Sequence, residues 1–258
     1  MNFRKFFALF IAFQLSFLHI LFSQNFPTDY VSHIWTAADG LPGNTITDII
    51  QTTDGYVYMG TYDGLVRFDG INFNIMNRNS DEKLGFSSAR VVFEDSHCNL
   101  WVGSNDEGVV KISGDSITKY DTTNGLPNNS VRDIVEDKLG NIWIGTASGV
   151  VLIKPDGIMS VPDGLDNIDN EHVLAVALYC DTAGRIWLST SKQGGIYYYS
   201  EGRFRHYDVL DYLNDRYGTY TVSAIGKDDL GNLIFGISHN GVVMIKNGVE
   251  NTPSVFKD

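Results

Sequence analysis

A short motif returns five times along this chain at nearly constant spacing, and this repeat constrains the fold more than any other feature. Each copy is an apolar run with one aromatic residue at its centre: Tyr58, Trp101, Trp143, Trp187 and Phe235. The steps between these residues are 43, 42, 44 and 48 positions. A period of about 40–50 residues with four short strands per copy is typical of a β-propeller blade. The repeat therefore predicts an all-β fold, a β-propeller of four-stranded antiparallel blades with about five repeats present.

The third repeat shows how one blade forms. Residues 131–136 read as an inner strand, and residues 137–141 as a hairpin turn in which Asp137 bonds the backbone ahead and Gly140 supplies a positive φ. The apolar run 142–146 is too short for a helix and fits a strand buried on both faces. Gly145 lets the neighbouring blade approach closely. Trp101, Trp143 and Trp187 lie inside such runs, so we expect them in the core between blades and not on a sugar-stacking platform.

The Asp-x-x-Gly turns and the two cysteines could suggest a metal site or a disulfide. A calcium loop needs six to eight oxygen ligands, and each turn supplies one or two carboxylates, so we predict no metal and no cofactor. Cys98 and Cys180 belong to repeats two apart along the chain. A disulfide spans only a few ångströms, so we expect both thiols to be free.

The first 23 residues read as a secretory signal peptide, followed by the propeller repeats over residues 24–258. Arg4 and Lys5 precede an apolar stretch at 6–22, and Ser23 offers a cleavage point. An uncleaved membrane anchor is the alternative. No second apolar run of about 18 residues follows, so we expect a periplasmic or secreted protein that meets a membrane only through that N-terminal segment or through missing parts. The net charge of −12 argues against a nucleic-acid partner.

Several elements of the third repeat resemble the two-component regulator propeller repeat: Gly-Leu-Pro-Asn-Asn at 125–129, Asp-x-x-Gly-Asn-Ile-Trp-Ile-Gly-Thr at 137–146 and the Gly-Val run that follows. The resemblance extends over about residues 30–258, with a second Gly-Leu-Pro at 40–42. It implies an extracytoplasmic sensor of a small solute, often a carbohydrate fragment, that signals to a sensor kinase or another output domain.

Family sensors commonly have seven blades, so the resemblance leaves two alternatives open: a part of a longer, seven-bladed sensor, or a five-bladed ring. Residues 29–36 precede the first Gly-Leu-Pro as residues 116–121 precede the second. We therefore expect 29–36 to be an outer strand that pairs with the last blade, closing its exposed edge. The run 254–258 resembles 116–121 and should be an outer strand too.

The Gly-Leu-Pro loops and the turns after each Trp-x-Gly strand should lie on one face, opposite the Asp-x-x-Gly hairpins, because strand direction alternates. Amides, hydroxyls and an aromatic on that face suit a sugar, although turns favour such residues anyway. The predicted ligand-binding residues are Asn44, Tyr62, Asp63, Asn105, Asp106, Glu107, Asn128, Asn129, Ser148, Lys192, Gln193, His239 and Asn240.

The chain carries no linear catalytic motif. It has no His-Glu-x-x-His, Gly-x-Ser-x-Gly or phosphate-loop pattern, which favours a ligand-sensing module over an enzyme. Two rival functions stay open, a secreted carbohydrate-active lyase or glycosidase and a protein-interaction platform, because propellers place catalytic groups without a linear signature. One basic, aromatic stretch at 197–207 reads either as a patch for an anionic sugar or partner, or as an outer strand with arginines at its edge.

Overall fold

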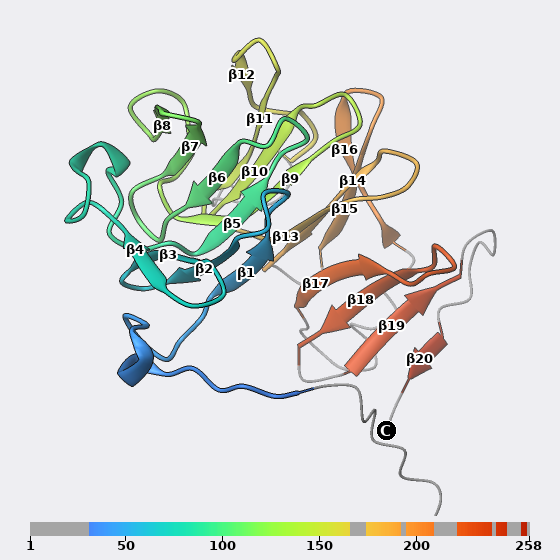
Figure 1. Cartoon of the computed structure of the whole chain (residues 1–258). Coiled ribbons are helices and arrows are strands. Elements are labelled where there is room, and N and C mark those ends of the chain that lie inside the picture. The colour runs from blue at the N-terminus through green and yellow to red at the C-terminus, as the bar shows by residue number, and fades with distance from the viewer. Residues whose placement is uncertain are drawn as a thin grey trace, which may run out of the picture. The chain divides into compact units, whose positions relative to one another are not determined.

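Five four-stranded antiparallel sheets follow one another along the chain in the computed structural model, which describes residues 31–165, 174–191, 195–208, 221–238, 241–246 and 254–256. Figure 1 shows these sheets in chain order from blue to red. The chain divides into two units, Met1–Trp35 and Thr36–Asp258, and all five sheets belong to the second. The predicted signal peptide lies outside the described residues.

Each sheet is one repeat, and the first strand of each repeat is its inner strand. The first blade contains β1 (Asp48–Gln51), β2 (Val57–Thr61), β3 (Gly64–Phe68) and β4 (Phe73–Met76). The second contains β5 (Val91–Glu94), β6 (Leu100–Gly103), β7 (Val109–Ser113) and β8 (Ser116–Tyr120). The third contains β9 (Val131–Glu136), β10 (Ile142–Thr146), β11 (Gly149–Ile153) and β12 (Met159–Ser160). These bounds confirm the strands predicted for the third repeat.

The last two blades repeat the pattern. The fourth contains β13 (Ala175–Cys180), β14 (Ile186–Thr190), β15 (Ile196–Ser200) and β16 (Arg203–His206). The fifth contains β17 (Val222–Lys227), β18 (Leu233–Ile237), β19 (Gly241–Ile245) and β20 (Ser254–Phe256). Among the described residues, the only helical turns are the 3-10 segments Ala37–Asp39 and Glu82–Leu84. The prediction of an all-β propeller is confirmed.

The outer strand of the fifth blade is supplied by the C-terminal run and not by the N-terminal one. β20 pairs with β19 as β8 pairs with β7, which confirms the expectation for residues 254–258 over Ser254–Phe256. The expectation for residues 29–36 is wrong where the structure describes them, because residues 31–36 form no strand. Thr36 instead caps the first 3-10 turn, and its hydroxyl accepts the N–H of Ala38.

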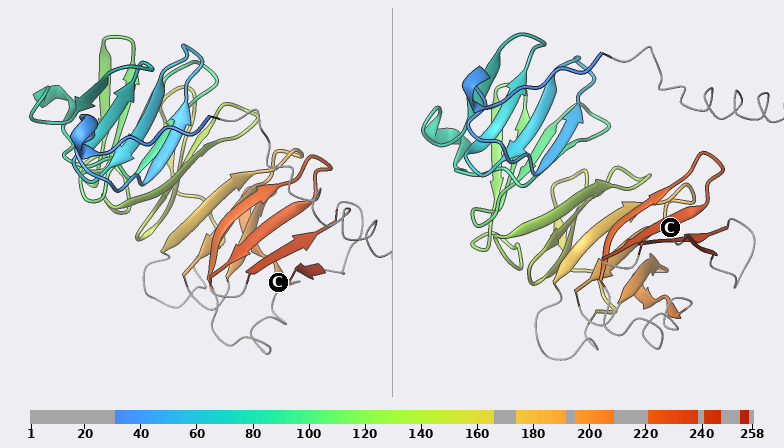
Figure 2. Two further views of the ribbon diagram at one scale, coloured as in Figure 1. Left: turned by 60° about the horizontal axis from the view of Figure 1, so that its bottom comes forward. Right: turned by 90° about the horizontal axis from the view of Figure 1, so that it is seen from below.

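The hydrophobic core lies between consecutive blades. Inner strands of successive blades contact each other, β1 with β5, β5 with β9, β9 with β13 and β13 with β17, and the views in Figure 2 agree. Four apolar clusters join blade one to two, two to three, three to four and four to five. Trp101, Trp143 and Trp187 belong to these clusters and are only 1–2% exposed, as predicted.

A polar bond orients each of these tryptophans. The indole Nε1 of Trp101, Trp143 and Trp187 donates to the carboxylate six residues earlier, at 2.8, 2.8 and 2.9 Å. Each of these aspartates, Asp95, Asp137 and Asp181, also accepts backbone N–H groups of its own turn. The turn acid therefore fixes both the hairpin and the blade's largest side chain, and its oxygens are occupied by these donors.

Gly140 and Gly184 have φ of 78° and 85°, as the turn chemistry predicts. In the second blade the same position is Cys98, which has a φ of 59°. Cys98 and Cys180 are both free thiols. In the part of the chain that the structure describes, no helix has both the length and the apolar character that a membrane span requires.

Candidate functional site

A cavity of about 480 Å³ is lined by the inner strands of all five blades. Most of its wall consists of residues at or just before the start of these strands, so it lies at the blade end that carries the Gly-Leu-Pro loops. The lining residues are Thr45, Ile46, Thr47, Asp48, Tyr62, Arg90, Val91, Arg132, Asp133, Val176, Ala177, Leu178, Ser223, Ala224 and Ile225. We call this cavity the central pocket.

One residue of each blade reaches the central pocket from an irregular place in its inner strand. In β9, β13 and β17 the register shifts beside Arg132, Val176 and Ser223, so that each of these residues has no direct partner on the next strand. Such a bulge redirects a side chain that regular alternation would place elsewhere.

Thr47 and Arg90 hold the same place just before β1 and β5. Their N–H groups donate to Gly60 and Gly103, the residues that pair with the next position of the inner strand. We call these five residues, Thr47, Arg90, Arg132, Val176 and Ser223, the pocket positions.

Two carboxylates beside the central pocket tie one blade to the next. Asp48 accepts the backbone N–H of Ile49 at 2.8 Å and that of Val92, in the second blade, at 2.8 Å. Asp133 repeats this arrangement with Ile134 at 2.9 Å and Leu178, in the fourth blade, at 2.6 Å.

Withdrawal from water raises the pKa of Asp133 to about 7, and the nearby charge of Asp48 acts in the same direction. Both side chains therefore act first as clamps between neighbouring blades.

Two arginines give the central pocket its positive charge. Arg90 Nη1 donates to Asn105 Oδ1 at 3.2 Å, and burial followed by the charge of Arg132 lowers the pKa of Arg90. The Nε of Arg132 is buried and has no hydrogen-bond partner among the described residues. The ion pairs of the described chain involve neither arginine. Among the described residues, neither guanidinium group thus has a carboxylate partner.

The structure brings one of the predicted ligand-binding residues, Tyr62, to the central pocket and places a second, Asn105, against the lining residue Arg90. Tyr62, in the turn between β2 and β3, lines the pocket and is 59% exposed. Asn105, in the turn between β6 and β7, holds Arg90. The predicted face is supported by a bond between its two loop types, since Asn128 Nδ2 donates to Ser148 Oγ at 3.0 Å.

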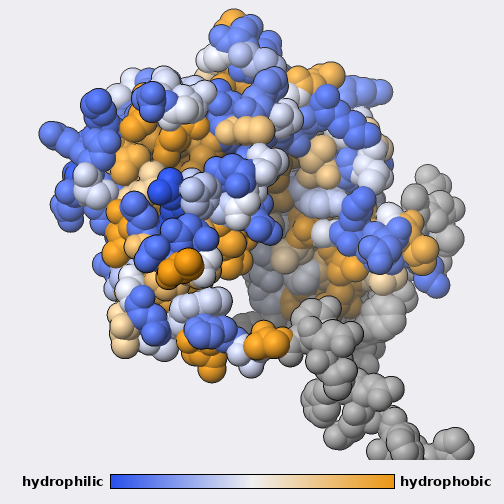
Figure 3. Space-filling view, viewed as in Figure 1, coloured by the Kyte–Doolittle hydropathy of each residue, from blue (hydrophilic) through white to orange (hydrophobic). Residues whose placement is uncertain are grey.

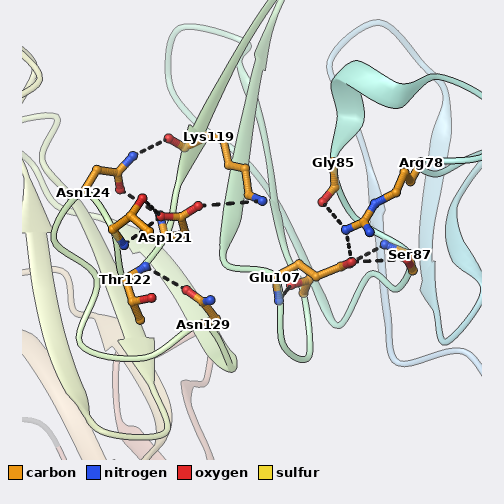
Figure 4. A network of polar contacts seen from close by, with 11 residues as sticks. Arg78, Gly85, Ser87, Glu107, Lys119, Asp121, Thr122, Asn124 and Asn129 are labelled. Atoms are coloured by element: carbon orange, nitrogen blue, oxygen red, sulfur yellow. Dashed lines mark hydrogen bonds and ion pairs between the residues drawn. The ribbon is translucent and has the colours of Figure 1, made fainter.

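Other predicted residues hold loops together. Asn44 and Asn129 each accept the backbone N–H seven residues earlier, that of Ala37 at 3.1 Å and that of Thr122 at 2.8 Å. Asp63 offers its carbonyl oxygen to Asn77. Figure 4 shows Asn129 directed to Thr122, and Glu107 directed to Arg78 and Ser87.

Asp106 lies in the same turn as Glu107 and Asn105. Lys192, Gln193, His239 and Asn240 lie outside the described residues. Ligand contact by any of the predicted residues stays a prediction.

Sequence reasoning missed Arg90 and Arg132. Both lie five residues before the turn aspartate of their repeat, Asp95 and Asp137. An alignment of the repeats on that aspartate shows Arg, Arg, Val and Ser at this place in the last four blades. The signal was present, but an apolar inner strand gives no reason to expect that this one position faces a pocket.

On the face shown in Figure 3, hydrophobic residues form several small groups among hydrophilic ones. The basic, aromatic stretch forms the outer hairpin of the fourth blade. Phe204 of β16 is buried, whereas Arg203 and Arg205 are exposed at the sheet edge. This arrangement matches the outer-strand interpretation of that stretch.

Comparison with known proteins agrees with this architecture. The model of the two component regulator propeller matches residues 40–63 and 125–148. The chain is 33% identical over 109 residues to a protein from Formosa agariphila named histidine kinase P4, a match that covers 40% of this chain and 7% of the kinase.

Solved structures share the fold. The extracellular domains of a putative one component system and of a putative hybrid two component system, both from B. thetaiotaomicron, superpose with TM-scores of 0.67 and 0.64 at 22% and 21% identity. They match 85% and 81% of this chain, which spans 29% and 27% of theirs.

Virginiamycin B lyase from Staphylococcus aureus has a TM-score of 0.63 at 15% identity, with 81% of this chain and 69% of the lyase covered. The fold is therefore shared by extracellular domains of putative one and two component systems and by an enzyme. The chain is a β-propeller, two of whose repeats match the two component regulator propeller.

Proposed function

We propose that this chain is the ligand-sensing propeller module of an extracytoplasmic signalling protein, and that the central pocket holds the solute, such as an oligosaccharide. The observation that carries the proposal is the pocket itself, to which each blade contributes one side chain at its pocket position. A solute that contacts all five blades can change their positions relative to one another. A sensor can pass such a change on to a partner as its signal. The N-terminal signal-like segment and the extracellular similar domains support an extracytoplasmic location.

A second candidate is a carbohydrate lyase or glycosidase on the same scaffold. It is favoured by Asp133, whose pKa of about 7 is in the range of a general acid or base, with Asp48 beside it. Against it, both carboxylates already accept two backbone N–H groups each. A carboxylate that clamps two blades has little freedom to exchange protons with a substrate, so we favour the sensor.

Calorimetry against oligosaccharide pools, run beside an assay for newly released reducing ends, tests the proposal. Binding without turnover is the expected result. Turnover would favour the enzyme, and the absence of both would favour a protein-interaction platform.

Ser223→Phe, at an exposed pocket position, should fill the cavity and reduce binding. Leu139→Phe, in the 79% exposed turn at the opposite end of the third blade, is the matched control and should bind like the unchanged protein. Equal binding by both variants would place the solute elsewhere.

A further inference from the structure

We propose that the central pocket recognises an anionic solute, a sugar that bears a carboxylate or a sulfate, through Arg90 and Arg132. This inference rests on the proposed function and names the chemical class of its ligand. It starts from a simple imbalance, since the pocket contains two cations and two acids that do not pair with each other.

The acids of the central pocket are occupied. Asp48 and Asp133 each use one oxygen for their own strand and the other for a backbone N–H of the following blade. Four good acceptor positions are thereby filled by backbone donors. The raised pKa of Asp133, about 7, also leaves that carboxyl partly neutral near physiological pH. Neither acid is therefore arranged to balance an arginine.

The two arginines of the central pocket have hydrogen-bond donors that the described residues do not use. Guanidinium carries five donors in a planar fork. At Arg90 one bond to Asn105 is present, and at Arg132 the buried Nε lacks a partner among the described residues. A buried donor without a partner costs free energy that a ligand oxygen can recover. Carboxylates and sulfates match the fork with two parallel, charge-assisted bonds.

The two cations also influence each other. The charge of Arg132 contributes to the lowered pKa of Arg90, so the two guanidinium groups are close enough to repel. An anion between them would relieve this repulsion and gain bonds to both. The chain as a whole carries a net charge of −12, which gives no general attraction for anions. An anion that binds must therefore find a local positive site.

The remaining lining fits a sugar. Tyr62 presents a largely exposed aromatic ring at the edge of the pocket, where it can cover the apolar face of a pyranose. Thr47 and Ser223 supply hydroxyl oxygens on other blades. Each hydroxyl donates to a backbone carbonyl, that of Ala89 and that of Gly236, and its oxygen can accept a bond from a sugar hydroxyl. A cavity of about 480 Å³ has room for a short oligosaccharide and lies in the usual range for small-molecule sites.

The test compares pairs of probes that share one sugar backbone and differ in whether the anionic group is present or masked. Trigalacturonic acid and its fully methyl-esterified form are titrated calorimetrically into the protein, together with a sulfated galactan disaccharide and its desulfated form. At least one anionic probe should bind. The affinity of its neutral counterpart should be lower by about tenfold or more. Binding by the acid alone or by the sulfate alone identifies which anion the site takes.

Arg132→Gln and Arg90→Gln should each weaken the anionic probe by about tenfold or more. Arg205→Gln, an exposed outer-strand arginine that pairs with Glu201, should leave binding unchanged. Without ligand, the melting temperature of Arg132→Gln should equal or exceed that of the unchanged protein, because a repelled and unsatisfied cation is removed. A clear fall would indicate a structural role and contradict the inference.

Tighter binding of the neutral members would overturn the anionic class and leave the proposed sensor function intact. Equal binding of charged and neutral members, or equal loss in all three arginine variants, would also overturn it. The same holds if none of the four probes binds, whereas the sensor function fails only if the broader oligosaccharide pools give no binding either.

Discussion

Single residues decide the local geometry of this propeller through the Asp-x-x-Gly turns. The turn glycine and its positive φ follow from sequence alone, because few other residues adopt that conformation without strain. The bond from the turn aspartate to the tryptophan six residues later was not predicted. It crosses the hairpin, and nothing in an apolar strand indicates where an indole N–H points.

Cys98→Gly should stabilise the protein. Cys98 has a φ of 59° at the place where the third and fourth blades have glycine, and a side chain in this region costs about 1–2 kcal/mol. The free energy of unfolding from urea titration should rise by about 1 kcal/mol, since glycine's greater freedom when unfolded offsets part of the gain. Gly140→Val and Gly184→Val, the reverse change, should lower it by about 1–3 kcal/mol. Similar effects of all three variants would contradict this account.

Asp133 should make stability fall as pH rises from about 4 to 7. Its pKa is about 7 in the folded chain, against an ordinary value of 3.8 when unfolded. Between these values the folded state holds a proton that the unfolded state has released, so the contribution is complete below 3.8 and lost above 7. Urea midpoints measured across this range should show the decline. Asp133→Asn should flatten the dependence of the urea midpoint on pH. An unchanged dependence would mean that another group causes the decline.

At the scale of strands and blades, the repeat period predicts the elements closely. The strands predicted for the third repeat at residues 131–136 and 142–146 have the bounds of β9 and β10. The pairing of residues 29–36 was harder to predict. Their similarity to residues 116–121 indicates an outer strand, but it does not indicate which segment of the chain pairs with β19. The C-terminal run fills that place.

Asp137→Ala should destabilise its blade more than Asp228→Ala does. Asp137 accepts bonds from its own turn and from the indole of Trp143, which is 1% exposed. Loss of the buried indole bond and the turn bonds should cost about 2–3 kcal/mol. Asp228 makes the turn bonds alone, since the residue six positions later is Ile234, whose side chain has no N–H to donate. Chemical unfolding checks the difference, and equal losses would show that the indole bond contributes little.

At the scale of the whole propeller, stability depends on how closely neighbouring blades approach. The close approach predicted at Gly145 recurs at Gly103, where an added Cβ would lie 2.5 Å from Val131 Cγ1 of the next blade. The central pocket could not be predicted in the same way. It depends on bulges, and a bulge is set by two strands together and leaves no mark on either sequence alone.

Gly103→Ala should lower the free energy of unfolding by about 1–3 kcal/mol, because the methyl group forces the second and third blades apart. Gly226→Ala is the matched control, since an added Cβ there meets nothing within 4 Å. Thermal and urea unfolding of both variants check this. A stable Gly103→Ala would mean that the blades can separate without loss, contrary to the packing described.

The pocket positions lie at the starts of the inner strands, three of them at bulges, and they are separate from the apolar packing between blades. None of the five residues at the pocket positions belongs to the buried core. The Thr47 hydroxyl donates to the Ala89 carbonyl, just before the second blade, at 2.9 Å, so a change at this position also removes a contact between blades. In chain order, the residues at the pocket positions of this propeller are Thr, Arg, Arg, Val and Ser. Under the proposed function, propellers with the same blades and different residues at the pocket positions should select different solutes. The five residues, each at a fixed distance before its turn, would then allow such propellers to be sorted by ligand chemistry from their sequences.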